Sequence, residues 1–211
     1  MIKQITLVLV VFACMQSVQA HRLAFNPFEF ELGESKCFLL EGNATGERKP
    51  WVWYAPTLPR HPDGSHTWYV DRLLAKGVSL AGCDQGEVRG SPKSVEVFTK
   101  FYHEMVRLGY SKKPVLLGQS RGGLMMLSWA VKNPDRVGGF AGIYPVLNLR
   151  SWPMKRNLGP TLADFGMDRD AFSKVIDQHN PINNLAGLAK AKVPICICLL
   201  YTSPSPRDSD S

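Results

Sequence analysis

The sequence predicts an α/β fold built on a mostly parallel, doubly wound sheet. From about residue 51 to residue 143, short apolar runs alternate with amphipathic stretches of helical length. This alternation is typical of a parallel sheet that helices cover on both faces. The 211 residues suffice for one domain with a substantial core. The apolar fraction of 45% and the charged fraction of 20% are those of a globular protein.

Strands are expected at residues 36–40, 51–55, 78–83, 115–117 and 137–143, with one more in the lead segment 21–32. The segment 51–55 is aromatic and β-branched, which suits a pleated surface. The apolar run at 115–117 reads as a buried strand, and a last strand begins at 193–195.

Helices are expected at residues 67–76, 94–108, 124–132 and 185–191. Gly77 closes the first as a C-terminal cap. In the second, Val97, Phe101, Met105 and Leu108 recur at helical spacing. Residues 148–184 break the rhythm, because they are polar and rich in Pro and Gly. We expect short helices there, forming a lid-like insertion over the site.

The N-terminus has the pattern of a secretory signal at residues 1–20. Lys3 supplies a positive charge, an apolar core runs from Ile5 to about Cys14, and Val18 and Ala20 are the small residues of a cleavage site. The apolar run is shorter than the roughly 20 residues of a membrane span. The signal predicts a secreted or periplasmic protein with no stable membrane span after cleavage. A lipoprotein signal ending at Cys14 is the weaker alternative, because bulky Phe12 stands where a small residue is usual.

Residues 198–211 do not fit the rest of the chain. One codon choice for Cys198 to Asp208 gives a string that resembles a transposase adapter used in sequencing libraries. We therefore expect this segment to be an artefact, and the natural domain, 21–197, to be incomplete. A disordered Ser/Pro tail is the alternative that composition alone allows.

Composition argues against several classes of function. The net charge of +7 comes from scattered Lys and Arg residues with no basic stripe, which argues against a nucleic-acid partner. Without the two ends, Cys37, Cys83 and Cys196 remain, and an odd number at irregular spacing is no disulfide framework. No motif has the spacing of a metal site, so we expect neither a metal nor a cofactor.

The most informative motif is Gly118-Gln119-Ser120-Arg121-Gly122, which fits G-x-S-x-G between an expected strand and an expected helix. In this context the motif forms a sharp turn that presents the serine hydroxyl at the carboxyl end of the sheet. Gly118 and Gly122 are the elbow glycines, because a Cβ there would meet the crossing backbone. Ser120 is therefore the expected nucleophile. A chance match in a tight turn is the alternative.

A serine nucleophile also needs donors for the oxyanion that forms when it attacks. One donor is expected to be the backbone N–H of Arg121, which directly follows the nucleophile. The other is expected in the loop after the 51–55 strand, at Thr57 or Leu58.

Several motifs together resemble the α/β-hydrolase superfamily, most closely its prolyl-oligopeptidase and dienelactone-hydrolase-like branches. The loop Asp84-Gln85-Gly86 through Gly90-Ser91 is similar to their Asp-x-x-Gly-x-x-x-Gly-Ser loop. Pro134-Asp135-Arg136-Val137 resembles the step after their nucleophile helix, and Asn180-Pro181-Ile182 resembles their Ser-Pro-Ile. The resemblance covers about residues 37–195. It implies an α/β-hydrolase sheet that lacks its last strand or strands and a helix.

In those families Ala-Lys-Val-Pro-Ile precedes the triad Asp and then the triad His. This chain has that run at residues 191–195, so the resemblance implies that both partners of Ser120 belong after Ile197. The other polar and aromatic candidates have ordinary structural explanations beside functional ones. His179 suits the lid or a helix cap, and His103 suits the solvent face of its helix. His61 and His66 flank the oxyanion loop and could line the pocket, although they stand upstream of the usual base. Asp84 suits the pocket wall or a cap of its own loop, Tyr144 and Trp152 suit the pocket or simple packing, and Arg121 suits substrate contact or an ion pair.

These observations predict a secreted serine hydrolase that cleaves an ester, or less readily a peptide, through an acyl-enzyme on Ser120. Its expected substrate is a small-molecule or carbohydrate ester. Without a base and a carboxylate, the chain as it stands is expected to be inactive. The alternative is a non-catalytic binding protein with the same fold.

Overall fold

The computed structural model describes residues 26–58 and 62–199. Its centre is a seven-stranded sheet in the order β1-β2-β4-β3-β5-β6-β7. The strands are β1 (Phe28–Leu32), β2 (Ser35–Leu40), β3 (Trp51–Ala55), β4 (Ser79–Cys83), β5 (Val115–Gln119), β6 (Gly139–Ile143) and β7 (Ile195–Cys198). Strands β3 to β7 run parallel, whereas β1 and β2 form an antiparallel edge. The prediction of a mostly parallel α/β sheet is confirmed.

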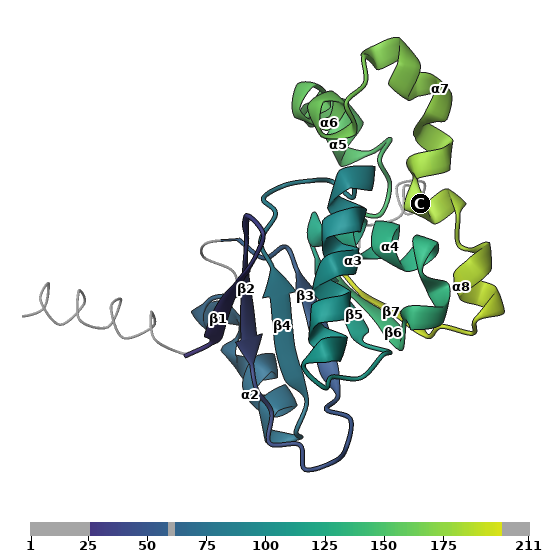
Figure 1. The fold of residues 1–211 in the computed structure, drawn as a ribbon. Coiled ribbons are helices and arrows are strands. Elements are labelled where there is room, and N and C mark those ends of the chain that lie inside the picture. The colour runs from purple at the N-terminus through teal and green to yellow at the C-terminus, as the bar shows by residue number, and fades with distance from the viewer. Residues whose placement is uncertain (1–25, 59–61, 200–211) are drawn as a thin grey trace, which may run out of the picture.

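Helices cover both faces of this sheet (Figure 1). Helix α2 (Thr67–Ala75) lies on one face, where Val70 packs with Tyr54, Leu80 and Leu117. Helices α3 (Pro92–Arg107), α4 (Gly122–Lys132) and α8 (Ala186–Lys190) cover the other face. That second core is rich in aromatic residues, and the ring of Trp53 lies 5.1 Å from that of Phe101 and 4.9 Å from that of Trp129.

Most expected elements lie within two residues of their observed bounds, and the differences have local causes. Helix α3 begins at Pro92 because Ser91 caps it: the Ser91 hydroxyl accepts a bond from the Ser94 N–H, and Pro92 occupies the first turn, where no N–H is needed. Strand β5 extends to Gln119, although Val115 at its start is 38% exposed and not buried as predicted.

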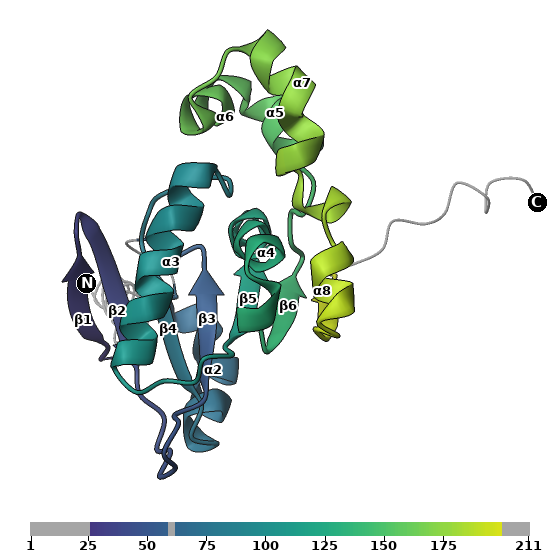
Figure 2. The same ribbon diagram turned by 45° about the vertical axis from the view of Figure 1, so that its right-hand side comes forward.

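The segment 148–184 contains three helices, α5 (Trp152–Arg156), α6 (Leu158–Phe165) and α7 (Arg169–His179), and a short turn of 3₁₀ helix, η3 (Pro181–Asn183). Figure 2 shows α5, α6 and α7 gathered beyond the end of the sheet to which β3 points. Phe165, Phe172 and Ile176 form a small core of their own, which packs on Leu124 at the start of α4. The insertion is thereby attached to the helix that follows the G-x-S-x-G turn.

Cys37 and Cys83 are directly paired in register across β2 and β4, and both are buried free thiols. A hydrogen bond with Cys83, together with burial, raises the pKa of Cys37 above its usual value. The signal pattern at residues 1–20 and the segment 200–211 lie outside the described residues. Within the described part, no helix combines the length and the apolar character that crossing a membrane requires.

The two backbones at Gly122 approach so closely that Gly122→Ala should destabilise the protein by about 3 kcal/mol or more. A Cβ at this position would lie 2.0 Å from the carbonyl oxygen of Ala55 and 2.4 Å from the Pro56 nitrogen. Urea-induced unfolding at equilibrium measures the loss. Gly159→Ala in α6 is the matched control, because no atom lies within 4 Å of its Cβ position. Alanine there should be neutral or stabilise by up to about 1 kcal/mol. Equal stabilities of the two variants would contradict the close crossing.

Candidate active site

Ser120 occupies the turn between β5 and α4 in a left-handed conformation, with a φ of 50°. A non-glycine residue rarely adopts this conformation, which costs of order 1–3 kcal/mol unless the surroundings impose it. Here three backbone hydrogen bonds hold Ser120 in this conformation. The Ser120 N–H donates to Ile143 O (3.0 Å), and the Ser120 carbonyl accepts from the N–H groups of Gly123 (3.0 Å) and Val146 (2.8 Å).

The two glycines of the motif are required by contact rather than by their own dihedral angles. A Cβ at Gly118 would lie 2.7 Å from the Gly123 Cα, so the chain folds back directly over this position. A Cβ at Gly122 would overlap the Ala55–Pro56 backbone. The turn at Ser120 is therefore as sharp as the sequence motif predicts.

The loop after β3 runs against this turn. Ala55 and Pro56 lie over Gly122, and Thr57 and Leu58 follow this crossing directly in the chain. The Thr57 side chain is buried, and its hydroxyl donates to Tyr54 O (3.1 Å), which holds the start of the loop. On the other side, no backbone carbonyl of the described residues accepts from the Arg121 N–H. The assignment of these N–H groups to an oxyanion hole remains a prediction.

A cavity of about 350 Å³ opens above Ser120. Its lining is Glu87, Ser120, Arg121, Val146, Trp152 and Asn157. The residues come from the loop after β4, the G-x-S-x-G turn, the loop after β6 and helix α5 with the residue that follows it. The lining is mainly polar, and Trp152 and Asn157 place the 148–184 insertion directly at the nucleophile.

The charges around this cavity are paired. Arg121 forms an ion pair with Glu87, and its guanidinium lies 5.8 Å from the centre of the Trp152 ring. Arg89, 6% exposed, lies 5.7 Å from the same ring and forms an ion pair with Asp164 of α6 (2.6 Å). Arg89 therefore connects the loop after β4 to the insertion. Of the two roles considered for Arg121, the ion pair is observed, and its side chain still borders the cavity.

The described histidines do not supply a base to Ser120. His103 is exposed on α3. His179 ends α7, where its ring lies 5.2 Å from that of Phe165 and burial lowers its pKa. His66 is 3% exposed and lies among Asp63, Tyr54 and Gln119, so it does not line the cavity. His61 lies outside the described residues.

Three other sequence candidates also have definite positions. Asp84 accepts a bond from the Gly86 N–H (2.8 Å), so it caps its own loop. Tyr144 accepts a bond from Gln119 and is not among the cavity residues, whereas Trp152 is. Sequence reasoning missed Glu87, Val146 and Asn157 as cavity residues. Glu87 lies inside the loop that carries the family resemblance, which is a usable signal, but nothing local distinguishes Val146 or Asn157.

No group of three or more His, Cys, Asp or Glu side chains suitable for a metal ion occurs within residues 26–58 and 62–199.

No protein-family model matches the chain, and no curated protein matches it in sequence. Solved structures do match in fold. Puromycin hydrolase superposes with a TM-score of 0.58 at 16% identity, over 82% of this chain and 34% of that one. Acylaminoacyl peptidase of Pyrococcus horikoshii matches with a TM-score of 0.56 at 11% identity, over 84% and 36%.

MPT51 of Mycobacterium tuberculosis matches with a TM-score of 0.58 at 12% identity, over 82% of this chain and 73% of that one. The chain therefore has the α/β-hydrolase fold, as the resemblance implied. It spans about a third of the length of the puromycin hydrolase and the acylaminoacyl peptidase.

The ion pair between Arg89 and Asp164 should contribute measurably to stability, because Arg89 is buried. We expect Asp164→Asn to lower the free energy of unfolding by about 2–3 kcal/mol, since the buried guanidinium loses its nearest counter-charge. The matched control is Asp177→Asn, which removes the charge from an exposed pair with Arg150 and should cost less than about 1 kcal/mol. Thermal unfolding of both variants measures the difference. Equal losses of stability would contradict a buried ion pair between the loop after β4 and the insertion.

Proposed function

We propose that this protein is an exported serine hydrolase that cleaves esters, or less readily peptides, through an acyl-enzyme on Ser120. The observation that carries the proposal is the left-handed conformation of Ser120 at a strand-to-helix turn beneath a cavity. A serine held in this conformation costs stability, and such strain persists where the surrounding structure fixes it for function. The fold is shared with proteins named as hydrolases and peptidases, which supports the same assignment.

In this reaction the Ser120 oxygen bonds to the acyl carbon, and its proton passes to a base and then to the leaving alcohol. Water then attacks the acyl-enzyme, releases the acid and returns the proton to Ser120. The N–H groups of Arg121 and of Thr57 or Leu58 would hold the negative oxygen of each tetrahedral intermediate. Because Arg121 is already neutralised by Glu87, its side chain is better suited to contact substrate than to carry the oxyanion charge.

The cavity favours a compact, polar substrate. Its volume of about 350 Å³ is near the lower end for small-molecule sites. Glu87, Arg121 and Asn157 offer hydrogen bonds, and Trp152 offers an aromatic edge or face. A small or carbohydrate ester fits this lining better than a long acyl chain. The insertion that carries Trp152 would act as a lid.

The proposed reaction needs a general base, and none of the described histidines supplies one to Ser120. The sequence has no histidine after His179, and the resemblance assigns the triad Asp and His to positions after Ile197. We therefore propose that the chain as it stands has a nucleophile without its activating pair. The second candidate function, a hydrolase-fold protein that binds a ligand without turnover, is favoured by this same observation.

A fluorophosphonate probe should label this chain at Ser120 only slowly, because a serine hydroxyl without a base is a weak nucleophile, and faster when imidazole is added. Peptide mass spectrometry locates the adduct. Ser120→Ala should abolish the labelling, and the matched control Ser128→Ala, which removes a buried hydroxyl from α4, should leave it unchanged. An adduct at another residue, or none at all after long incubation, would favour the binding protein.

Imidazole in solution should accelerate the reaction of this chain with the probe and with p-nitrophenyl acetate by about tenfold, because it supplies the missing base. Esterase assays over a range of imidazole concentrations measure the effect. Imidazole itself hydrolyses p-nitrophenyl acetate, so the rate of a blank without protein is subtracted at each concentration. Ser120→Ala should show no increase above that blank. High activity without imidazole, reduced by His179→Gln, would show that a histidine of this chain is the base and would contradict the proposal.

A further inference from the structure

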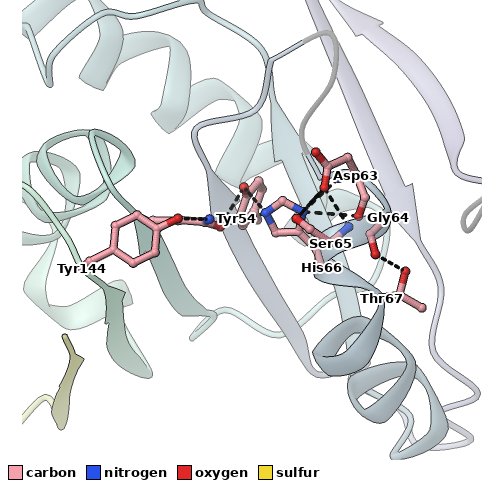
Figure 3. A network of polar contacts seen from close by, with 8 residues as sticks. Tyr54, Asp63, Gly64, Ser65, His66, Thr67 and Tyr144 are labelled. Carbon is pink, nitrogen blue, oxygen red and sulfur yellow. Dashed lines mark hydrogen bonds and ion pairs between the residues drawn. The ribbon is translucent and has the colours of Figure 1, made fainter. Parts of the chain in front are cut away.

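A chain of polar side chains runs beneath the Ser120 turn on the α2 side of the sheet (Figure 3). It begins at Asp63, passes through His66 to Gln119 at the end of β5, and ends at Tyr144 after β6. Tyr54 of β3 lies beside it. It therefore joins the carboxyl ends of three neighbouring strands to the loop that follows β3.

Both ring nitrogens of His66 face an acceptor. Nδ1 lies 2.8 Å from Asp63 Oδ1, and Nε2 lies 2.9 Å from Gln119 Oε1. The Asp63 backbone N–H also donates to Nδ1 (3.0 Å), so the ring is held by both the backbone and the side chain of Asp63. The hydroxyl and the backbone N–H of Ser65 donate to the same Asp63 oxygen, and with His66 they hold the pKa of Asp63 at about 2. Asp63 is thus ionised at neutral pH.

Gln119 transmits this contact to the nucleophile turn. Its Nε2 donates to the Tyr144 hydroxyl (2.6 Å), and its Oε1 also accepts from Tyr54 (3.2 Å). Tyr144 has a φ of 37° and begins the turn that holds Ser120. Its neighbour Ile143 accepts the Ser120 N–H, and Val146 donates to the Ser120 carbonyl. The hydrogen bonds of Gln119, Ile143 and Val146 therefore connect two residues with positive φ, Ser120 and Tyr144.

We propose that His66 and Gln119 are positioning residues for Ser120. His66, held by Asp63, fixes the Gln119 amide, and the amide fixes Tyr144 at the start of the turn that holds Ser120. As a role in catalysis this rests on the proposed function, whereas the effect of His66 on the Ser120 turn does not.

The titratable groups that face His66 keep one charge state near neutral pH, so their contacts with the ring do not change there. Burial raises the pKa of Tyr54 on β3 and of Tyr69 on α2, so both stay neutral. Tyr69 contacts the ring edge to face at 5.8 Å, and Tyr144 reaches it only through Gln119. Asp63 keeps its negative charge throughout.

Amide hydrogen exchange tests the positioning role without any need for turnover. We expect His66→Gln to raise the exchange rates of the Ser120 and Val146 amides about tenfold, while the amides of Trp53 and Leu116 in the core keep their rates. The matched control, His103→Gln on the exposed face of α3, should change none of them. Equal rates for Ser120 in the two variants, or an equal rise throughout the core, would overturn the proposal.

Nitrogen NMR of the His66 ring in the unaltered chain supplies the second readout, which holds even if a variant fails to fold. Ring-nitrogen shifts that report hydrogen bonds at both Nδ1 and Nε2 are expected. Gln119→Leu should remove the bond at Nε2 and raise the exchange rate of the Ser120 amide, whereas Gln119→Glu keeps an acceptor and should preserve both.

Ring signals that show no hydrogen bond at Nε2, or an unchanged Ser120 exchange rate in Gln119→Leu, would overturn the positioning role. The proposed hydrolase function and the positioning role can be refuted separately. A chain in which His66 holds the Ser120 turn but which gives no fluorophosphonate adduct, even with imidazole, refutes the hydrolase. A chain that is labelled at Ser120 but whose Ser120 amide does not respond to His66→Gln or Gln119→Leu refutes the positioning role alone.

Discussion

The close crossing of two backbone segments at Gly122 is the constraint on which the site depends. The Ala55–Pro56 peptide lies where a side chain of residue 122 would be, and Ala55 is paired in register with Gly118 on the neighbouring strand. One contact therefore fixes the end of β3, the end of β5 and the start of α4 together. With both flanks held so tightly, the chain can pass through Ser120 only by adopting a positive φ, and the bonds from Ile143 and Val146 offset that cost.

Much of the fold could be predicted because its signals are local. The aromatic run of β3, the helical spacing in α3 and the G-x-S-x-G turn each lie within a few consecutive residues. The start of α3 was misplaced by two residues, because Pro92 was read as loop rather than as the first helical residue. The exposure of Val115 was also missed, since apolar character alone does not tell which end of a strand is covered.

The candidate site was predicted only where it depends on neighbours in sequence. Ser120 and its glycines follow from a five-residue pattern. By contrast, the contact of His66 with Gln119 spans 53 positions, and the pair of Arg89 with Asp164 spans 75. No periodicity or motif encodes such separations. The helices of the insertion were expected only as a group, because their packing depends on Leu124 of α4, far from them in sequence.

The charges around the cavity explain how a polar insertion can cover a nucleophile without a large apolar contact. Arg89 is buried, and its charge is balanced by Asp164 and Glu87. Arg89 and Arg121 both lie against the ring of Trp152. Removing the insertion would expose Arg89 and leave Arg121 with Glu87 alone. The loop after β4 and the insertion therefore together form one wall of the cavity. Because each of these cations has a carboxylate partner, the wall offers hydrogen bonds without strong net charge.

The side chains that hold the Ser120 turn lie on a different face of the sheet from the cavity in which Ser120 would react. Side chains alternate along β5, so Gln119 lies on the same face as Leu117, toward α2, while Ser120 turns toward the cavity. The polar chain from Asp63 to Tyr144 thus holds the turn from below, where no cavity-lining residue lies. A change on that side can alter how firmly Ser120 is held without altering what the cavity recognises. Gln119, the residue before the nucleophile, is therefore the point at which the buried contact with His66 reaches the site.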